Sequence, residues 1–320
     1  MKRKNQKVKI KEVKIKEKDK DAKAQQRRKQ SGAMEKDKTG MLSNAVLKNI
    51  AYITMFIDHF FAIVYYTLVW KLQTAGYVVG NEERIYAAGR AVGRIAFILF
   101  AYLAVEGFLH TKSRKAYLLR LGVFAFVSEI PFDLAFSEVC FNRGSQNVFF
   151  TLLIGVLVLA AWEWAEQKAD GLRMPVDSRG HGTITSVTRV VLRVAAIAAV
   201  LLGCLAAYEL RTDYRFMGVL LIFAFYLTRE RSLPVQVAAA GCVMLFGTWG
   251  ANCLKYGDSY TLSYLFRFSM REMYGLFAFI PIALYNGQKG RQLPKTVCYG
   301  FYPVHLLLLH FVAQMISGRV

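Results

Sequence analysis

The stretch Lys48-Asn-Ile-Ala-Tyr-Ile-Thr-Met-Phe-Ile-Asp58-His59 begins an apolar run that continues to Trp70. A run of this length can span a bilayer, which takes roughly 20 apolar residues in a helix. Lys48 and His59 are eleven positions apart, so they fall on one helix face and lie roughly 16 Å from each other. Asp58 points elsewhere on the helix and is expected to meet another helix. Because ionisable groups at such depth usually face a bundle interior, the stretch predicts a membrane helix with a polar side.

Composition extends this prediction to the whole chain. The 320 residues are 55% hydrophobic, with 23 Phe, 17 Tyr and only 6 Pro, and the mean hydropathy is +0.28. Continuous apolar segments separated by short polar connections are typical of helical membrane proteins, in which the helix satisfies every backbone amide. We therefore expect an all-α polytopic membrane protein with about nine transmembrane helices in one bundle. The expected helices cover residues 45–70, 86–110, 116–137, 146–166, 187–208, 214–228, 234–254, 274–285 and 296–316. The eighth is short, so it either uses residues 260–270 as well or is re-entrant.

The net charge of +20 is concentrated at the amino terminus, where residues 1–40 hold 16 Lys and Arg against 6 Asp and Glu. We expect residues 1–44 to form a basic, disordered tail beside anionic membrane lipid, and residues 45–316 to form the membrane domain. No aromatic residues interleave the lysines, so nucleic acid is not an expected partner. Most Lys- and Arg-rich connections fall on one side if the spans alternate. This asymmetry predicts a multi-pass protein of the cytoplasmic membrane with its amino terminus in the cytoplasm.

Further charged residues recur inside the apolar segments. Gly89 and Gly93 permit close helix approach, and Arg94 lies deeper in the same helix than Arg90. Arg94 either pairs with Asp58 as a structural ion pair or joins a polar site with His59, and the two interpretations are compatible. Charged and histidine side chains on at least four helices indicate a shared polar cavity. The additional members are Glu106, Arg120, Glu129, Asp133 and His305.

The absence of several known motifs argues against ATP-driven transport, dehydrogenase chemistry and zinc proteolysis. The chain has no Walker loop, no dinucleotide-binding glycine pattern, no zinc-protease motif and no Gly-x-Ser-x-Gly turn. The five cysteines are scattered without metal-ligand spacing, so no metal site is expected.

Several of these segments together resemble one family, the TraX proteins, over nearly everything from 45 to 316. The matching segments are Lys48…Asp58-His59, Gly93-Arg94-Ile-Ala-Phe97…Glu106-Gly107, Tyr117-Leu-Leu-Arg120, Ile130-Pro131-Phe132, Asn147-Val and Tyr302-Pro303-Val-His305. The resemblance implies an inner-membrane protein associated with pilin acetylation and related to the membrane acyltransferases. In that wider group a basic residue precedes a histidine by the spacing of Lys48 and His59. It therefore implies acyl transfer from acetyl-CoA, a coenzyme A thioester, to a pilin or surface-polymer acceptor.

The resemblance suggests a role for each candidate residue. His59 would be the catalytic base, Arg94 or a tyrosine would stabilise the oxyanion, and Asp58 would orient an arginine or a histidine of another helix. Lys48 and Arg120 either bind coenzyme A phosphates or are ordinary basic residues of the cytoplasmic side, and Glu106 and His305 would line the substrate site. A secondary transporter or permease and a non-catalytic assembly factor of a conjugation system remain open as alternatives.

Overall fold

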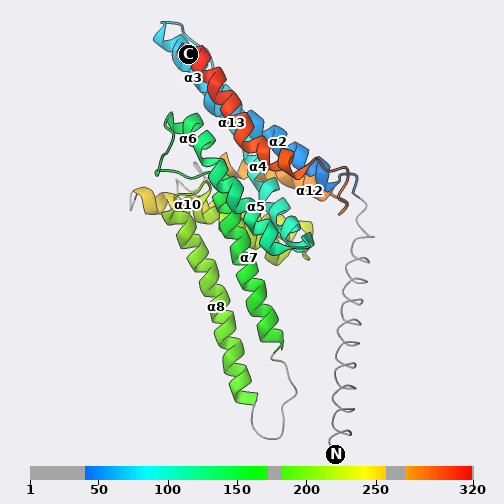
Figure 1. The fold of residues 1–320 in the computed structure, drawn as a ribbon. Coiled ribbons are helices and arrows are strands. Elements are labelled where there is room, and N and C mark those ends of the chain that lie inside the picture. The colour runs from blue at the N-terminus through cyan, green and yellow to red at the C-terminus, as the bar shows by residue number, and fades with distance from the viewer. Residues whose placement is uncertain (1–39, 172–181, 257–270, 319–320) are drawn as a thin grey trace, which may run out of the picture.

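The computed structural model describes residues 40–171, 182–256 and 271–318 (Figure 1). Every regular element in these ranges is a helix, and extended pairing is limited to two isolated bridges, which confirms the all-α class. The predicted disordered tail, apart from its last residues, and the segment 260–270 lie outside the described residues.

The first apolar run is one continuous helical rod in three parts. It consists of α2 (Asn44–His59), the π-helix η1 (Phe60–Tyr65) and α3 (Tyr66–Thr74). The helices that follow are α4 (Glu82–His110), α5 (Arg114–Val127), α6 (Glu129–Ser137), α7 (Val148–Gly171), α8 (Gly182–Glu209), α9 (Arg215–Thr228), α10 (Leu233–Tyr256), the 3₁₀ helix η3 (Tyr274–Ala278), α12 (Phe279–Ala283) and α13 (Lys295–Ser317).

Six helices in the described part of the chain are long and apolar enough to cross a membrane, so the protein is membrane-embedded, but nine spans are not confirmed. The six are 44–74, 82–110, 148–170, 187–209, 233–250 and 295–317. The predicted third helix is divided, because α5 ends at Val127 and α6 starts at Glu129. Pro131 lies in the first turn of α6, where its missing N–H has no intrahelical partner to lose, whereas in the interior of one longer helix it would remove a backbone hydrogen bond. Two other predicted spans are short. The one at 214–228 is α9 with 14 residues, and the one at 274–285 consists of η3 and α12 with 5 residues each.

Contacts between connections show how the helix ends are grouped. Leu42 pairs with Tyr285, and the Tyr285 hydroxyl donates to Glu106 Oε2 over 3.1 Å, so these residues mark one end, here called the Leu42 end. Gln146 pairs with Thr212 at the opposite end, here called the Thr212 end. The two groupings fit helices that run alternately between the ends.

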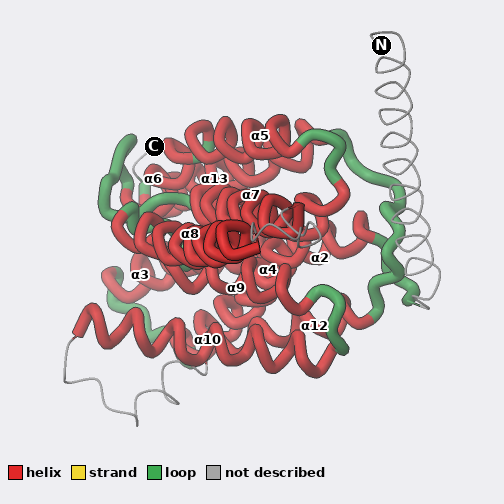
Figure 2. The backbone as a smooth tube through the Cα atoms, turned by 90° about the horizontal axis from the view of Figure 1, so that it is seen from below, coloured by secondary structure: helices red, strands yellow, loops and turns green. Residues whose placement is uncertain are grey.

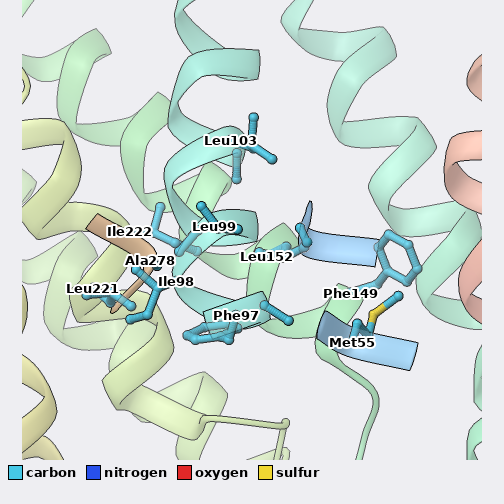
Figure 3. Close-up of a cluster of buried hydrophobic side chains, with 14 of the residues drawn as sticks. Met55, Phe97, Ile98, Leu99, Leu103, Phe149, Leu152, Leu221, Ile222 and Ala278 are labelled. Atoms are coloured by element: carbon cyan, nitrogen blue, oxygen red, sulfur yellow. The ribbon is translucent and has the colours of Figure 1, made fainter. Parts of the chain in front are cut away.

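The core is centred on α4. Ile98 and Leu99 of α4 are almost fully buried against Leu221 and Ile222 of α9, and Figure 3 shows Phe149 and Leu152 of α7 on the other side of this helix. In Figure 1, α3 and α13 lie together in the upper part, and α7 and α8 descend side by side. Figure 2 shows α5 and α10 at opposite edges, with α7 and α8 between them.

The predicted close helix approach at Gly89 and Gly93 of α4 is confirmed, and the helices that approach there are η1 and α2. A Cβ at Gly89 would lie 2.1 Å from the Phe61 ring, and one at Gly93 would lie 2.1 Å from Asp58 Oδ1. Such distances are far inside van der Waals contact, so only glycine allows the Asp58 carboxyl group to rest on α4.

Candidate active site

Two buried histidines from helices distant in sequence meet in the bundle. Nδ1 of His59, at the end of α2, lies 2.7 Å from Nε2 of His305 in α13. The rings are nearly parallel, with an interplanar angle of 6° and centroids 5.0 Å apart. His59 is 9% exposed and His305 is 3% exposed. The structure thus joins two predicted site residues that are 246 positions apart.

The hydrogen bonds of this histidine pair have a defined direction. Nδ1 of His305 lies 2.7 Å from the Phe301 carbonyl oxygen, which can only accept, so this nitrogen carries the proton. When His305 is neutral, its Nε2 is then an acceptor, and Nδ1 of His59 must donate to it. In the neutral pair, Nε2 of His59 is consequently left with a free lone pair, which is the arrangement that a general base requires.

The surroundings of the pair are aromatic and its backbone is irregular. Phe136 and Tyr302 form T-shaped ring pairs with His59, at centroid distances of 5.5 and 5.9 Å. The π-helix η1 begins directly after His59. Short π-helical segments are rare and are frequent at functional sites, so the change of helical register here is consistent with a site built around His59.

Asp58 faces the other side of α2 and forms an ion pair with α4. Its Oδ2 accepts a hydrogen bond from Arg90 over 2.7 Å, and 13% of its side chain is exposed. The predicted pairing of Asp58 with Arg94 is therefore wrong. Arg94 instead pairs with Glu272 at 3.0 Å and donates to the Tyr214 hydroxyl over 3.3 Å.

Helix geometry explains why the sequence did not show that Asp58 pairs with Arg90 and not with Arg94. Arg90 and Arg94 are one turn apart on a shared face of α4, and spacing alone does not say which of them is level with Asp58. Glu272 was not among the predicted site residues, because it precedes the short segment η3 and follows residues outside the expected helices. The only feature of the sequence that could have pointed to Glu272 is that this acidic residue lies directly before an apolar segment.

The predicted substrate-binding residues, other than His305, do not converge on the histidine pair. Nζ of Lys48 donates to Gln292 Oε1 over 2.6 Å at the Leu42 end. Glu106 binds Tyr285 at the same end, and the Arg120 guanidinium lies 6.0 Å from the Tyr117 ring. The contacts of Lys48 and Arg120 with coenzyme A, and the place of Glu106 in the substrate site, stay predictions.

A further polar cluster joins α6 to the beginning of α7. Glu129 Oε2 accepts hydrogen bonds of 2.5 and 3.3 Å from the side chain and the backbone N–H of Asn147. Nδ2 of Asn147 also donates to the Ala125 carbonyl, and its own side chain is fully buried. Burial of the Glu129 carboxyl group raises its pKa, and the hydrogen bonds from Asn147 oppose that rise. These hydrogen bonds connect the junction between α5 and α6 to the beginning of α7.

Fold and site together define an all-helical integral membrane protein with a histidine pair and ion pairs inside its bundle. The TraX protein family model matches residues 43–313, most of the chain, and the chain belongs to that family. It is also 25% identical over 274 residues to the probable fimbrial assembly protein FimC, serogroup H1, of Dichelobacter nodosus, covering 82% of this chain and 92% of that protein. No solved structure matches the chain.

Proposed function

We propose that this protein is an integral-membrane acyltransferase that moves an acetyl group from acetyl-CoA to an amine or hydroxyl at the membrane surface, with His59 as general base. The observation that carries the proposal is the directed hydrogen-bond chain from His59 through His305 to the Phe301 carbonyl. Acyl transfer from a thioester needs a group that removes a proton from the attacking nucleophile, and histidine is the most frequent choice. The chain leaves one nitrogen of His59 able to do so.

The proposed step balances within this arrangement. The acceptor nitrogen or oxygen bonds to the acetyl carbonyl carbon while Nε2 of His59 takes the acceptor's proton. The carbon–sulfur bond of the thioester then breaks, and the departing thiolate of coenzyme A receives that proton. His305 keeps Nδ1 of His59 as the donor throughout and stabilises the positive charge that His59 gains, in the manner of the third group of a catalytic triad.

Two other predicted roles rest on weaker support. Arg94 makes its contacts with Glu272 and Tyr214, so its proposed action on the oxyanion requires this ion pair to rearrange. Asp58 holds Arg90, not a histidine, and therefore serves as a positioning residue that fixes α2 against α4.

The donor is proposed to enter from the Leu42 end. Lys48, Arg291 and Gln292 line a small crevice there, and these side chains suit the phosphates of coenzyme A. With the amino terminus in the cytoplasm, this end faces the compartment that holds acetyl-CoA. The FimC relative is named as a probable fimbrial assembly protein, which supports a pilus subunit as one acceptor, and a surface polymer is the other.

That same name favours a second candidate function, a non-catalytic factor for pilus assembly. In that case the histidine pair would be a packing element, and its substitution would affect stability without affecting any turnover. The two functions therefore differ in a measurable way.

The test is transfer of radiolabelled acetyl from acetyl-CoA by purified protein in liposomes to membranes from cells that lack the gene. His59→Ala should lower the rate by about 10²-fold or more while the helical circular dichroism is retained. His305→Ala should also lower it, and His305→Gln, which can offer an acceptor to His59, should restore part of it. His310→Ala is the matched control, because this histidine of the same helix is partly exposed and, within the part of the chain that the structure describes, has a ring contact with Phe311 alone.

Three outcomes would reject the proposal. A folded His59→Ala protein with the parental rate removes His59 from the reaction. Absence of transfer by the parent, with normal pilus assembly by His59→Ala in cells, supports the assembly factor. Movement of a solute into the liposomes without acetyl transfer supports a transporter.

A further inference from the structure

A polar cavity of about 390 Å³ lies at the Thr212 end of the bundle, away from the crevice beside Lys48. Its wall is formed by residues of α4 and α10, the loop before α7, the loop between α8 and α9, the first turn of α9, and Glu272. This volume is many times the roughly 10–15 Å³ that one water molecule needs, and it suits a small polar headgroup. His59 and His305 do not line it, so the cavity is separate from the histidine pair.

The loop between α8 and α9, together with the first residue of α9, forms part of the cavity wall in a strained conformation. Arg211, Tyr214 and Arg215 have φ angles of 53°, 61° and 44°, in the left-handed region that side chains with a Cβ rarely adopt. Clustered strain of this kind persists only where the surroundings enforce it, and it is concentrated at ligand-binding and active sites.

Several contacts enforce this conformation. The backbone of Gln146 accepts from the N–H of Asp213 over 2.8 Å and donates to the Arg211 carbonyl over 3.1 Å. The Tyr214 ring stacks on Phe97 with centroids 3.6 Å apart. The loop is therefore fixed before any ligand arrives, and it holds two arginines at the cavity.

Charge determines what the cavity can bind. Arg94 is neutralised by Glu272 at 3.0 Å, which leaves Arg211, Arg215 and Asp213 as the remaining charges of the lining. Within the described ranges, neither Arg211 nor Arg215 forms an ion pair. The surplus is positive, and guanidinium groups match the oxygens of a phosphate particularly well. Asp213 adds a carboxylate that can accept hydrogen bonds from hydroxyl groups.

We infer that this cavity binds a hydroxyl-bearing phosphate ester, with the phosphate on Arg211 and Arg215 and a hydroxyl on Asp213. Such a group can be the headgroup of an anionic phospholipid or a soluble phosphate ester. The inference concerns binding alone and does not depend on acyl transfer. If the proposed reaction holds, a ligand here would approach from the end opposite the acyl donor.

The experiment has two arms that distinguish the sources. In detergent, purified protein is titrated with sn-glycerol 3-phosphate, and binding is measured by calorimetry. In nanodiscs, the shift in Tm is compared between phosphatidylglycerol and phosphatidylcholine. A response to glycerol phosphate assigns a soluble ester, and a response to phosphatidylglycerol alone assigns a lipid headgroup.

The variants distinguish binding at the cavity arginines from binding that depends only on the overall positive charge of the chain. Arg211→Gln/Arg215→Gln should weaken binding at least about tenfold, because both phosphate contacts are lost. Arg231→Gln/Lys168→Gln removes the same charge from exposed positions elsewhere and should bind like the parent. The conservative pair Arg211→Lys/Arg215→Lys should recover part of the affinity.

The inference is overturned if neither probe binds the parent, or if both glutamine pairs weaken binding equally. Retained binding by folded Arg211→Gln/Arg215→Gln protein would overturn it as well. None of these results bears on His59, so the acyl-transfer proposal is judged separately.

Discussion

Replacing the members of the Asp58–Arg90 ion pair tests how α2 and α4 are held together. Oδ2 of Asp58 and Nη1 of Arg90 are 2.7 Å apart, and 13% and 20% of the two side chains, respectively, are exposed. At an effective dielectric constant of about 20, charges at this separation attract by about 6 kcal/mol, before the cost of removing both from water is subtracted. Removing one partner of a buried pair typically costs about 3–5 kcal/mol, because the other charge is left uncompensated. Partial exposure places Asp58→Asn and Arg90→Gln near the lower figure.

The assay is a double-mutant cycle on the free energy of unfolding, measured by SDS titration in mixed detergent micelles. We expect a coupling energy of about 2–3 kcal/mol for Asp58 with Arg90, the upper part of the range for contacting residues. The matched cycle of Asp58 with Arg94 should give less than about 1 kcal/mol, because Arg94 contacts Glu272 instead. A larger coupling to Arg94 than to Arg90 would refute this assignment of partners.

Two further predictions concern packing and orientation. Gly93→Ala should destabilise the protein by at least about 1–3 kcal/mol in the same titration, because the added Cβ would lie 2.1 Å from Asp58. Gly241→Ala is the control and should leave stability nearly unchanged, since the nearest neighbour of its Cβ would be 3.7 Å away. Equal effects of the two substitutions would contradict the tight contact at Gly93. A reporter placed between Arg229 and Arg231 should be active in the cytoplasm and one fused after residue 320 should be active outside, and the reverse pattern would invert the proposed topology.

Features of single helices were predictable from the sequence. The length and apolarity of the segments around α4, α7 and α13 predict membrane helices, and Gly89 with Gly93 predicts a close helix contact, because these signals depend on residues in one window. The direction of Asp58 toward a different helix from that of His59 also follows from helical periodicity. Each of these properties is local in the chain.

Features that depend on relative helix placement were not predictable. Which of Arg90 and Arg94 pairs with Asp58 depends on how far α2 is shifted along its axis relative to α4. The helix face that the two arginines share gives no information about this shift. Glu272 enters the site only because η3 packs against α4. The division at Ser128 did have a local signal in Pro131, but the continuous apolar pattern of 116–137 favoured one helix. The pairing of His59 with His305 needs the register of two helices that are separated by the whole domain.

The contacts along one face of α2 explain how that register arises. Lys48, Tyr52 and His59 lie on this face, as the spacing of Lys48 and His59 predicted. Their hydrogen-bond partners are, in the same order, Gln292, the carbonyl oxygen of Cys298, and His305. Both sets advance in the same direction, so α2 runs parallel to α13 and the segment before it. A donor anchored beside Lys48 would follow this shared edge for about three turns to reach His59, and the π-helix that begins there marks where the regular packing of α2 ends.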